Sequence, residues 1–343
     1  MTRRGFLGAA AAVPVAGAAP LAAGCGRTPS WDRAAYRKAD RSRVAILPAR
    51  DYTVPLTDVV LQGIRHFPLA VAGRKVVLKP NLVEFDPAGV INTHPAVIAA
   101  AVEAFRRLGA REVVVAEGPG HRRDTEHLVA ASGLFRTLTD LGARYIDLNH
   151  DDVRSVTLRS RFTELGRLHL PETILGADLI VSMPKLKTHH WAGVTLSLKN
   201  MFGVVPGMVY GWPKNVLHWA GIDASIIDVS AAVHPDLQIV DGIVAMEGNG
   251  PIQGTPKDMG VLVFGTDMVA TDATSARLMG FDPERIPYLN EAGTFLGQVH
   301  LEEIQQVGED PEALAQDFEV LPAFASYKVG AAPASGGTVG AQA

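Results

Sequence analysis

Lys75-Val-Val-Leu-Lys79 and Glu112-Val-Val-Val-Ala116 are two short apolar segments, and an amphipathic stretch from Pro95 to Leu108 lies between them. Neither apolar segment alternates with polar residues, which is typical of strands that are buried on both faces. The stretch between them has apolar residues at helical spacing and is followed by Gly109, a residue type that often ends helices. A strand, a helix and a second strand in this order predict two parallel strands with a helix packed on one face.

The same pattern continues along the chain. Further strands are predicted at Val44–Pro48, Arg144–Leu148, Asp178–Met183, Gln238–Met246 and Gly260–Phe264. Further helices are predicted at Asp124–Ala131, Leu134–Leu141, Ile222–Val233 and Asp272–Met279. The expected fold class is therefore α/β, with a mostly parallel or mixed sheet and helices on both faces. This layering is Rossmann-like, but no Gly-x-Gly-x-x-Gly opens a helix, so the dinucleotide-binding fingerprint is missing.

Composition limits the class of protein. The chain has 343 residues and 47% hydrophobic content, which is enough for a substantial core. A net charge of −4 and an aromatic content of 6% argue against nucleic-acid binding. We predict a signal segment at residues 1–25, a tether at 26–41, a single α/β domain at 42–328 and a disordered tail at 329–343.

The N-terminus is typical of an exported protein. Thr2-Arg3-Arg4-Gly5-Phe6-Leu7 resembles the twin-arginine motif, and the apolar stretch that follows is too short to span a membrane comfortably. Leu21-Ala-Ala-Gly-Cys25 resembles a lipoprotein cleavage box. We therefore expect export by the twin-arginine translocase and lipidation of Cys25, which would anchor the protein on the outer side of the cytoplasmic membrane. Without lipidation the protein would be periplasmic or extracellular.

Cys25 is the only cysteine in the chain. A single cysteine excludes an internal disulfide framework and a self-contained iron–sulfur cluster with cysteine ligands. The twin-arginine route carries folded proteins, some of which have already bound a cofactor. The route thus points only to a cofactor of unknown identity; a metal ion is a candidate because of the histidines considered below, and no organic cofactor is identified from the sequence.

Lysine replaces arginine in the middle of the chain. The chain contains 23 arginines and nine lysines, yet the segment between Arg167 and Arg277 has no arginine and five lysines. These are Lys185, Lys187, Lys199, Lys214 and Lys257. Lysine is a compact point charge whose pKa moves on burial, whereas arginine is a fixed planar fork. A solvated lysine face is the alternative, but three of these lysines are interleaved with Pro, Gly, His and Asn, so we expect the chemistry between Lys185 and Asn200.

Five polar or glycine-rich turns follow predicted strands. They are Lys79-Pro-Asn81, Glu117-Gly-Pro-Gly120, Pro184-Lys185, Glu247-Gly-Asn-Gly250 and Gly265-Thr-Asp267. In open α/β sheets, ligands bind at the carboxyl ends of the strands. Any one turn is readily explained as an ordinary connection, but the set of five predicts that they converge on one cleft.

The candidate site residues follow from this cleft. The residues expected to bind substrate are Lys79, Asn81, Glu117, Lys185, Lys187, Asn200 and Asn249. The candidate catalytic residues are His189, Glu247 and Lys199. Lysines would hold an anion or stabilise developing negative charge, and His189 or Glu247 would transfer a proton. His94, His189 and His218 are candidate metal ligands, with hydrogen bonding to substrate or backbone as the alternative role.

Several motifs occur together in a fixed order. They are Lys79-Pro-Asn-Leu82, Thr93-His-Pro95, Glu117-Gly-Pro-Gly120, Met183-Pro-Lys-Leu-Lys-Thr-His189, Gly193-Val-Thr-Leu-Ser-Leu-Lys-Asn-Met-Phe-Gly203, Ile239-Val-Asp-Gly-Ile-Val-Ala-Met-Glu-Gly-Asn-Gly-Pro251 and Gly280-Phe-Asp-Pro283. With these motifs, the region from Arg43 to Gly297 resembles domain of unknown function family 362. Some members of that family carry an appended ferredoxin module. This chain has no Cys-x-x-Cys, so the resemblance implies no iron–sulfur cluster of its own.

Two functions remain open from the sequence. The first is an enzyme acting on a small anionic substrate, a carboxylate or a phosphate compound. The second is a non-catalytic lipoprotein that binds a metal or metabolite at the cell envelope, and an interaction scaffold is a weaker third reading. Perturbed pKa values in the cleft would favour the enzyme, whereas satisfied and unperturbed polar groups would favour the binding protein.

Overall fold

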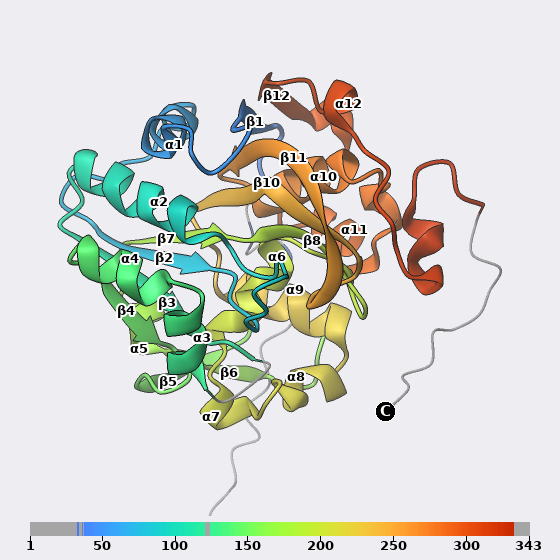
Figure 1. Ribbon diagram of the computed structural model, residues 1–343. Helices are drawn as coiled ribbons and strands as arrows, with labels where there is room; N and C mark the ends of the chain where they lie inside the picture. Colours follow the sequence, from blue (N-terminus) through green and yellow to red (C-terminus); the bar gives the residue numbers. More distant parts are fainter. Residues whose placement is uncertain (1–32, 34–35, 37, 121–123, 333–343) are drawn as a thin grey trace, which may run out of the picture.

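The computed structural model describes residues 33, 36, 38–120 and 124–332 (Figure 1). Within them, ten strands form one sheet. Its main order is β12 (Ile304–Gly308), β1 (Ser42–Pro48), β11 (Gln253–Gly265), β10 (Leu237–Asn249), β7 (Leu179–Met183), β2 (Lys75–Pro80), β3 (Glu112–Glu117) and β4 (Arg144–Asp147). Beside this path, β8 (Lys185–His189) pairs with β10 and with β9 (Gly193–Thr195). A separate hairpin consists of β5 (Val153–Thr157) and β6 (Arg167–Pro171).

The sheet is mixed but mostly parallel. β4, β3, β2, β7 and β10 run parallel to one another in this order, and β1 runs parallel to β12. β11 is antiparallel to both of its neighbours, β1 and β10. The predicted fold class, an α/β protein with a mostly parallel or mixed sheet, is confirmed.

Successive residues of the central strands pack into two separate cores. In β11, Leu262 and Phe264 belong to one core and Val261 and Val263 to the other. This is why the strands lack polar alternation, since both faces of the sheet are covered. One face is covered by α1 (Leu56–Arg65), α2 (Pro95–Arg107), α3 (Thr125–Ala131) and α4 (Leu134–Asp140). The other is covered by α6 (Ser197–Asn200), α9 (Ile222–Ala232), α10 (Met268–Leu278) and α11 (Pro287–Gly293).

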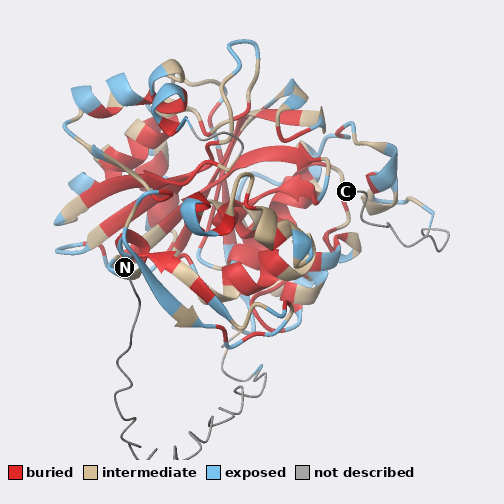
Figure 2. Ribbon diagram, turned by 90° about the horizontal axis from the view of Figure 1, so that it is seen from below, coloured by how far each residue is buried: buried red, intermediate tan, exposed pale blue. Residues whose placement is uncertain are grey.

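The remaining elements are short and lie around this sandwich. They are α5 (Glu172–Leu175), α7 (Gly207–Tyr210), α8 (Asn215–Trp219), α12 (Pro311–Leu314) and the 3-10 turns Met201–Val204, Pro283–Arg285, Leu301–Glu303 and Pro322–Tyr327. Figure 2 shows the buried strands at the centre of the molecule and the exposed residues on its outer helices and loops. In the part of the chain that the structure describes, no helix is both long and apolar enough to cross a membrane.

All seven predicted strands are present, but β10 and β11 extend well beyond the apolar residues that identified them. Glu247 and Asn249 therefore lie inside β10 instead of following it. β8 was not predicted, because two lysines, a threonine and a histidine among its five residues do not resemble the apolar run expected of a buried strand. Nor were α1, β9, β12 and the hairpin formed by β5 and β6 predicted.

The direction of β11 corrects one part of the predicted cleft. Gly265 pairs with Gln238 at the start of β10 and with Val44 near the start of β1. Because β11 is antiparallel, its end lies at the edge where the parallel strands begin. The turn Gly265-Thr-Asp267 is thus remote from the rim formed by the carboxyl ends of β2, β3 and β7. Asp267 instead caps α10 by accepting from Val269 N and Ala270 N.

The ends of the predicted domain are partly packed. Tyr36, within the predicted tether, contacts Phe295 edge to face, and Lys38 Nζ donates to Gly293 O at 2.8 Å. At the other end, Val329 N donates to Gly280 O. The predicted signal with Arg3, Arg4 and Cys25 lies outside the described residues, as do the last residues of the predicted tail.

Packing of α1 on β11 yields a stability prediction. A Cβ on Gly63 would lie 2.5 Å from the ring of Phe264, a core residue with no exposed surface. Gly63→Ala should therefore lower the free energy of unfolding by about 1–3 kcal/mol through overpacking, although alanine is the better helix former by about 1 kcal/mol. Urea denaturation measures this change. Gln62→Ala, on the exposed face of α1, should stay within about 0.5 kcal/mol of the parent; equal stability of both variants would contradict the packing.

Candidate functional site

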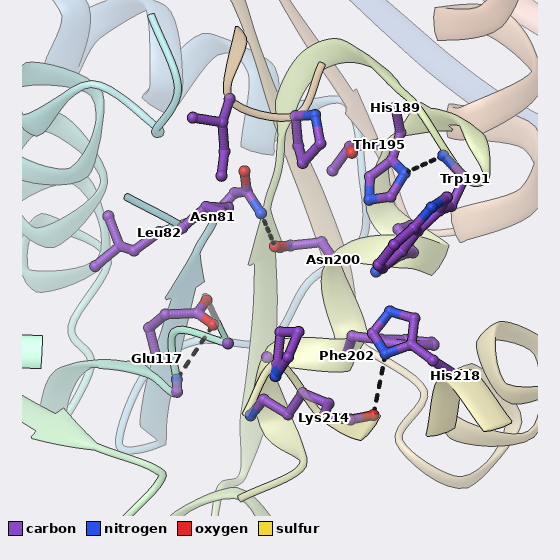
Figure 3. Close-up of a pocket in the computed structure, with 18 of the residues that line it drawn as sticks. Asn81, Leu82, Glu117, His189, Trp191, Thr195, Asn200, Phe202, Lys214 and His218 are labelled. Atoms are coloured by element: carbon purple, nitrogen blue, oxygen red, sulfur yellow. Dashed lines mark hydrogen bonds between the residues drawn. The ribbon is translucent and has the colours of Figure 1, made fainter. Parts of the chain in front are cut away.

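A cavity of about 250 Å³ opens beside the carboxyl ends of β2 and β3 (Figure 3). We call it the central cavity. Its polar and aromatic lining consists of Asn81, Glu117, His189, His190, Trp191, Thr195, Lys199, Asn200, Phe202, Lys214 and His218. Pro251 and Ile252 reach it from the turn between β10 and β11. Of the predicted site residues, the structure thus brings Asn81, Glu117, His189, Lys199, Asn200 and His218 together.

A buried ion pair lies at the inner end of the central cavity. Lys79 at the end of β2 and Glu117 at the end of β3 bond directly, with 0% and 2% of their side chains exposed. Lys79 Nζ also donates to Asn200 Oδ1 and to Pro80 O, each at 3.0 Å. Burial raises the pKa of Glu117 and lowers that of Lys79, and the attraction between the two charges opposes both shifts. Lys79 is therefore engaged within the protein, and its charge compensates that of Glu117.

Gly203 permits this pair to be covered. A Cβ at this position would lie 1.8 Å from Glu117 Oε1 and 2.6 Å from Lys79 Nζ. Gly203 O also accepts from Gly118 N at 3.0 Å. The last glycine of the Lys199-Asn-Met-Phe-Gly203 motif is thus required by the close approach of backbone to the ion pair.

Lys199 has a different environment. It is half-buried on α6, and its Nζ lies 3.8 Å from the centre of the Phe202 ring. Among the described residues, it has neither a hydrogen-bond acceptor nor a carboxylate partner. Burial, reinforced by the charges of Lys79 and Lys214, lowers the pKa of Lys199 to about 7. The ammonium is therefore available to a ligand, held by a cation–π contact alone.

Asp272 fixes the helix that carries Lys199 and Asn200. This carboxylate projects from the middle of α10 and accepts from Ser197 N at 2.7 Å and Leu198 N at 2.9 Å, the first backbone donors of α6. Burial raises the pKa of Asp272 to about 7. A buried acceptor at the start of α6 explains why four residues can form a fixed helical turn at the cavity wall.

Lys214 is a cavity residue that sequence reasoning did not select. It precedes α8 with a φ of 70°, and its Nζ donates to Val205 O and, at 3.2 Å, to Asn149 Oδ1. Burial lowers its pKa to about 7, with Glu117 opposing the shift. Its position in the arginine-free segment was the one sequence feature that pointed to Lys214. The left-handed backbone that directs its side chain into the cavity cannot be predicted from the residue types alone.

Hydrogen bonds fix the tautomers of two cavity histidines, His189 and His218. His189 Nδ1 accepts from Trp191 N at 3.0 Å and Ala192 N at 3.2 Å, so the ring proton lies on Nε2. Burial and the nearby Lys199 hold the pKa of His189 well below its usual value. His218 is opposite: its Nδ1–H donates to Lys214 O at 3.1 Å, and burial lowers its pKa to about 4. His189 is therefore a neutral donor: for the predicted proton transfer it can give the proton on Nε2, but Nδ1 is engaged by two backbone donors and is not free to accept one.

The predicted three-histidine metal site is not formed. His94 lies outside the central cavity, where Nδ1 accepts from Ala96 N and the ring stacks on Tyr52 at 3.7 Å. His189 cannot offer a lone pair from Nε2 without giving up both backbone bonds. Across residues 33–332, as far as they are described, no three His, Cys, Asp or Glu side chains are placed to hold a metal ion.

Lys185 and Lys187 are buried beside the cavity, not in its lining. Lys185 Nζ donates to Asp241 Oδ2 at 2.9 Å and to Tyr52 Oη at 2.8 Å. Lys187 Nζ donates to Ile91 O at 2.6 Å and to Pro251 O at 3.2 Å. Burial lowers the pKa of both lysines. Their hydrogen bonds connect loops at the rim of the sheet. These contacts therefore indicate a structural role for both side chains, in place of the predicted contact with substrate.

Glu247 and Asn249 also lie away from the cavity. Glu247 Oε2 accepts from Lys257 Nζ at 2.8 Å and from Glu319 N at 2.9 Å. Asn249 is exposed and donates to Gln253 Oε1 within the hairpin of β10 and β11. The extension of β10 carries both residues past the rim. The roles predicted for them, a general base and a substrate contact, therefore lack the necessary geometry.

Comparison with known proteins identifies the family. The family described as "Domain of unknown function (DUF362)" matches residues 76–277, more than half of the chain, and the chain belongs to this family. The "Thylakoid-associated protein sll1697" of Synechocystis sp. (strain ATCC 27184 / PCC 6803 / Kazusa) is 30% identical over 224 residues. That match covers 63% of this chain and 66% of the relative, just under two thirds of the relative's length.

Solved structures resemble the chain more distantly. The lactate racemase apoprotein from Thermoanaerobacterium thermosaccharolyticum has a TM-score of 0.45 and 13% identity, with 71% of this chain and 58% of that chain covered. A crystal structure of a protein from Thermotoga maritima has a TM-score of 0.39 and 13% identity, with 62% and 55% covered.

The buried ion pair gives a prediction about stability. Glu117→Gln leaves the Lys79 charge uncompensated and should destabilise the fold by about 3–5 kcal/mol in urea denaturation. Replacing both partners, in Lys79→Met with Glu117→Gln, should cost less than the sum of the two single changes. Glu112→Gln is the matched control, because Glu112 bonds Arg144 at 3.2 Å on the surface, and it should change stability by about 0–1 kcal/mol. Additive effects at Lys79 and Glu117 would contradict the coupling.

Proposed function

We propose that this member of the DUF362 family is an enzyme that acts on a small anionic substrate, a carboxylate or phosphate compound, in the central cavity. The observation that supports this most is Lys199, whose ammonium has no acceptor among the described residues. Among the described residues of the lining, the one carboxylate, Glu117, is already paired with Lys79. An incoming anion would supply the charge that Lys199 and Lys214 lack, in surroundings where electrostatic attraction is strong.

The pKa values favour catalysis over binding alone. An acid or base is most effective when its pKa lies near the working pH, and burial brings both Lys199 and Lys214 to about 7. In this proposal Lys199 holds the anion as an ammonium. As a neutral amine it takes a proton from the bound substrate and, as the ammonium so formed, returns it, while Lys214 adds positive charge. His189 donates from Nε2 to developing negative charge.

A non-catalytic anion-binding protein is the second candidate. The hydrogen bonds of His189 and Glu117 support it, because acceptor atoms of both side chains are already engaged by backbone N–H groups. Incubation with candidate anions in deuterium oxide, followed by mass spectrometry, separates the two functions. Deuterium on carbon that depends on Lys199 would support the enzyme, and unaltered bound anions would support the binding protein.

Anion binding should depend on pH with a defined sign. Lys199 is charged below about 7 and neutral above it, so affinity should be high at low pH and fall as pH rises through 7. We expect weaker binding of glycolate and of sulfate at about pH 8.5 than at about pH 6 in isothermal titration, because neither probe titrates in this interval.

Substitution at Lys199 tests the same binding. Lys199→Met should weaken both probes by about tenfold or more, the size of one lost charge-assisted hydrogen bond. Lys257→Met is the control, since Lys257 is paired with Glu247 outside the cavity. Unchanged affinity in Lys199→Met, or the same loss in Lys257→Met, would remove the basis of the proposal.

We further propose that the chain is exported by the twin-arginine translocase and lipidated at Cys25, as the N-terminal sequence indicates. Arg3→Lys combined with Arg4→Lys should retain the protein in the cytoplasm, because the translocase reads the arginine pair. Cys25→Ala should release the mature protein from membranes. Cell fractionation measures both effects; normal export of the double variant or membrane retention of Cys25→Ala would refute the respective step.

A further inference from the structure

Two buried polar atoms in the central cavity lack partners. Asn81 Oδ1 and Thr195 Oγ1 are the cavity atoms of this kind among the described residues. The side chains are 7% and 3% exposed, respectively, so bulk solvent does not satisfy them. Buried polar groups in native proteins are nearly always hydrogen-bonded, and exceptions at a cavity wall indicate contacts that a ligand completes.

The amide of Asn81 has only one orientation that fits its neighbours. Lys79 O can only accept, so Asn200 turns its Nδ2 toward that carbonyl at 3.2 Å. Asn200 Oδ1 then accepts from Lys79 Nζ at 3.0 Å and from Asn81 Nδ2 at 3.2 Å. Asn81 Oδ1 is therefore a fixed acceptor, and Figure 3 shows it turned away from the bond to Asn200. A ligand must offer an O–H or N–H group at this position.

Two of the other polar groups in the cavity, on Lys199 and His189, are donors. Lys199 Nζ has no acceptor within the part of the chain described, and His189 carries its proton on Nε2 because Nδ1 accepts from two backbone groups. Thr195 Oγ1 can donate or accept. Neutral His218, whose proton lies on Nδ1, can accept at Nε2. The cavity thus combines donors that suit an anionic group with Asn81 Oδ1, a buried acceptor without a partner that suits a hydroxyl or an amino group.

Charge distinguishes the hydroxyl from the amino group. An amino group next to a carboxylate is an ammonium at neutral pH, and Lys199 and Lys214 would repel it. Glu117 offers little compensation, because it is paired with Lys79.

The size of the cavity limits the ligand to a small molecule. Its volume of about 250 Å³ lies below the roughly 300–1,000 Å³ typical of pockets for drug-sized ligands.

We propose that the substrate of the central cavity is a small hydroxy acid, whose anionic group meets Lys199 and His189 and whose hydroxyl donates to Asn81 Oδ1. This inference rests on the proposed function and narrows it to one substrate class.

Matched ligands test the proposal by isothermal titration with the whole protein. Glycolate should bind about fivefold or more tightly than acetate, and malate more tightly than succinate, since each pair differs by one hydroxyl. Glycolate should also bind more tightly than glycine, which carries an ammonium in place of the hydroxyl. Equal affinity within the two hydroxyl pairs, or preference for glycine, would overturn the hydroxy-acid assignment.

Variants locate the preference. Asn81→Leu should bring the glycolate-to-acetate ratio to about one while acetate affinity stays close to that of the parent. Thr195→Val removes a hydroxyl that has no partner in the described protein, so this variant should fold and should bind glycolate more weakly if Oγ1 contacts the ligand. If Asn81→Leu does not fold, the ratio in the parent protein still decides. An unchanged ratio in a folded Asn81→Leu protein would overturn the role of Asn81.

These experiments distinguish failure of the hydroxy-acid assignment from failure of the proposed anion site. Lys199-dependent binding of acetate and glycolate with equal affinity would overturn the hydroxy-acid class and leave the anion site standing. Binding of neither probe, or binding that is unaffected by Lys199→Met, would overturn the anion site and the substrate class together.

Discussion

The buried pair of Lys79 and Glu117 is the constraint on which the rest of the site depends. Two opposite charges with almost no exposed surface are tolerated because they bond to each other, and because Lys79 also donates to Asn200 and Glu117 also accepts from Gly118 N. Parallel β2 and β3 bring their carboxyl ends together, and Gly203 lets backbone cover the pair. The pair also uses Glu117, the one carboxylate among the described lining residues, so within that part of the chain no second acid of the lining compensates Lys199 and Lys214.

Positive charge is therefore concentrated in the central cavity and not cancelled there. Asp272 holds α6 so that Lys199 faces the cavity, and the hydrogen bonds of His189 keep that ring neutral. Burial lowers the pKa values of Lys199 and Lys214 more than the nearby Glu117 raises them, an unfavourable arrangement for stability that a bound anion would relieve. The contacts that position Lys199 and keep His189 neutral thus also favour the proposed anionic ligand.

Much of the fold followed from the sequence because buried strands leave a strong signal. Runs such as Lys75–Lys79 identify two-sided strands, and the arginine-free segment drew attention to Lys199, which lies in the lining of the central cavity. The site was less predictable where long-range geometry decides. Glu247 was misplaced because the length of β10 is set by pairing with β11, not by its apolar run. The tautomer of His189 depends on two backbone donors, and the inward path of Lys214 depends on a left-handed turn.

The titration of Lys199 tests the account most directly. Nuclear magnetic resonance of protein labelled at the lysine side chains follows each Nζ, and the Lys199→Arg variant assigns the signal. The account predicts a midpoint of about 7 for Lys199, moving upward when glycolate or sulfate is added, because a bound anion favours the ammonium. A midpoint near the ordinary lysine value of about 10.4, unmoved by either anion, would contradict it.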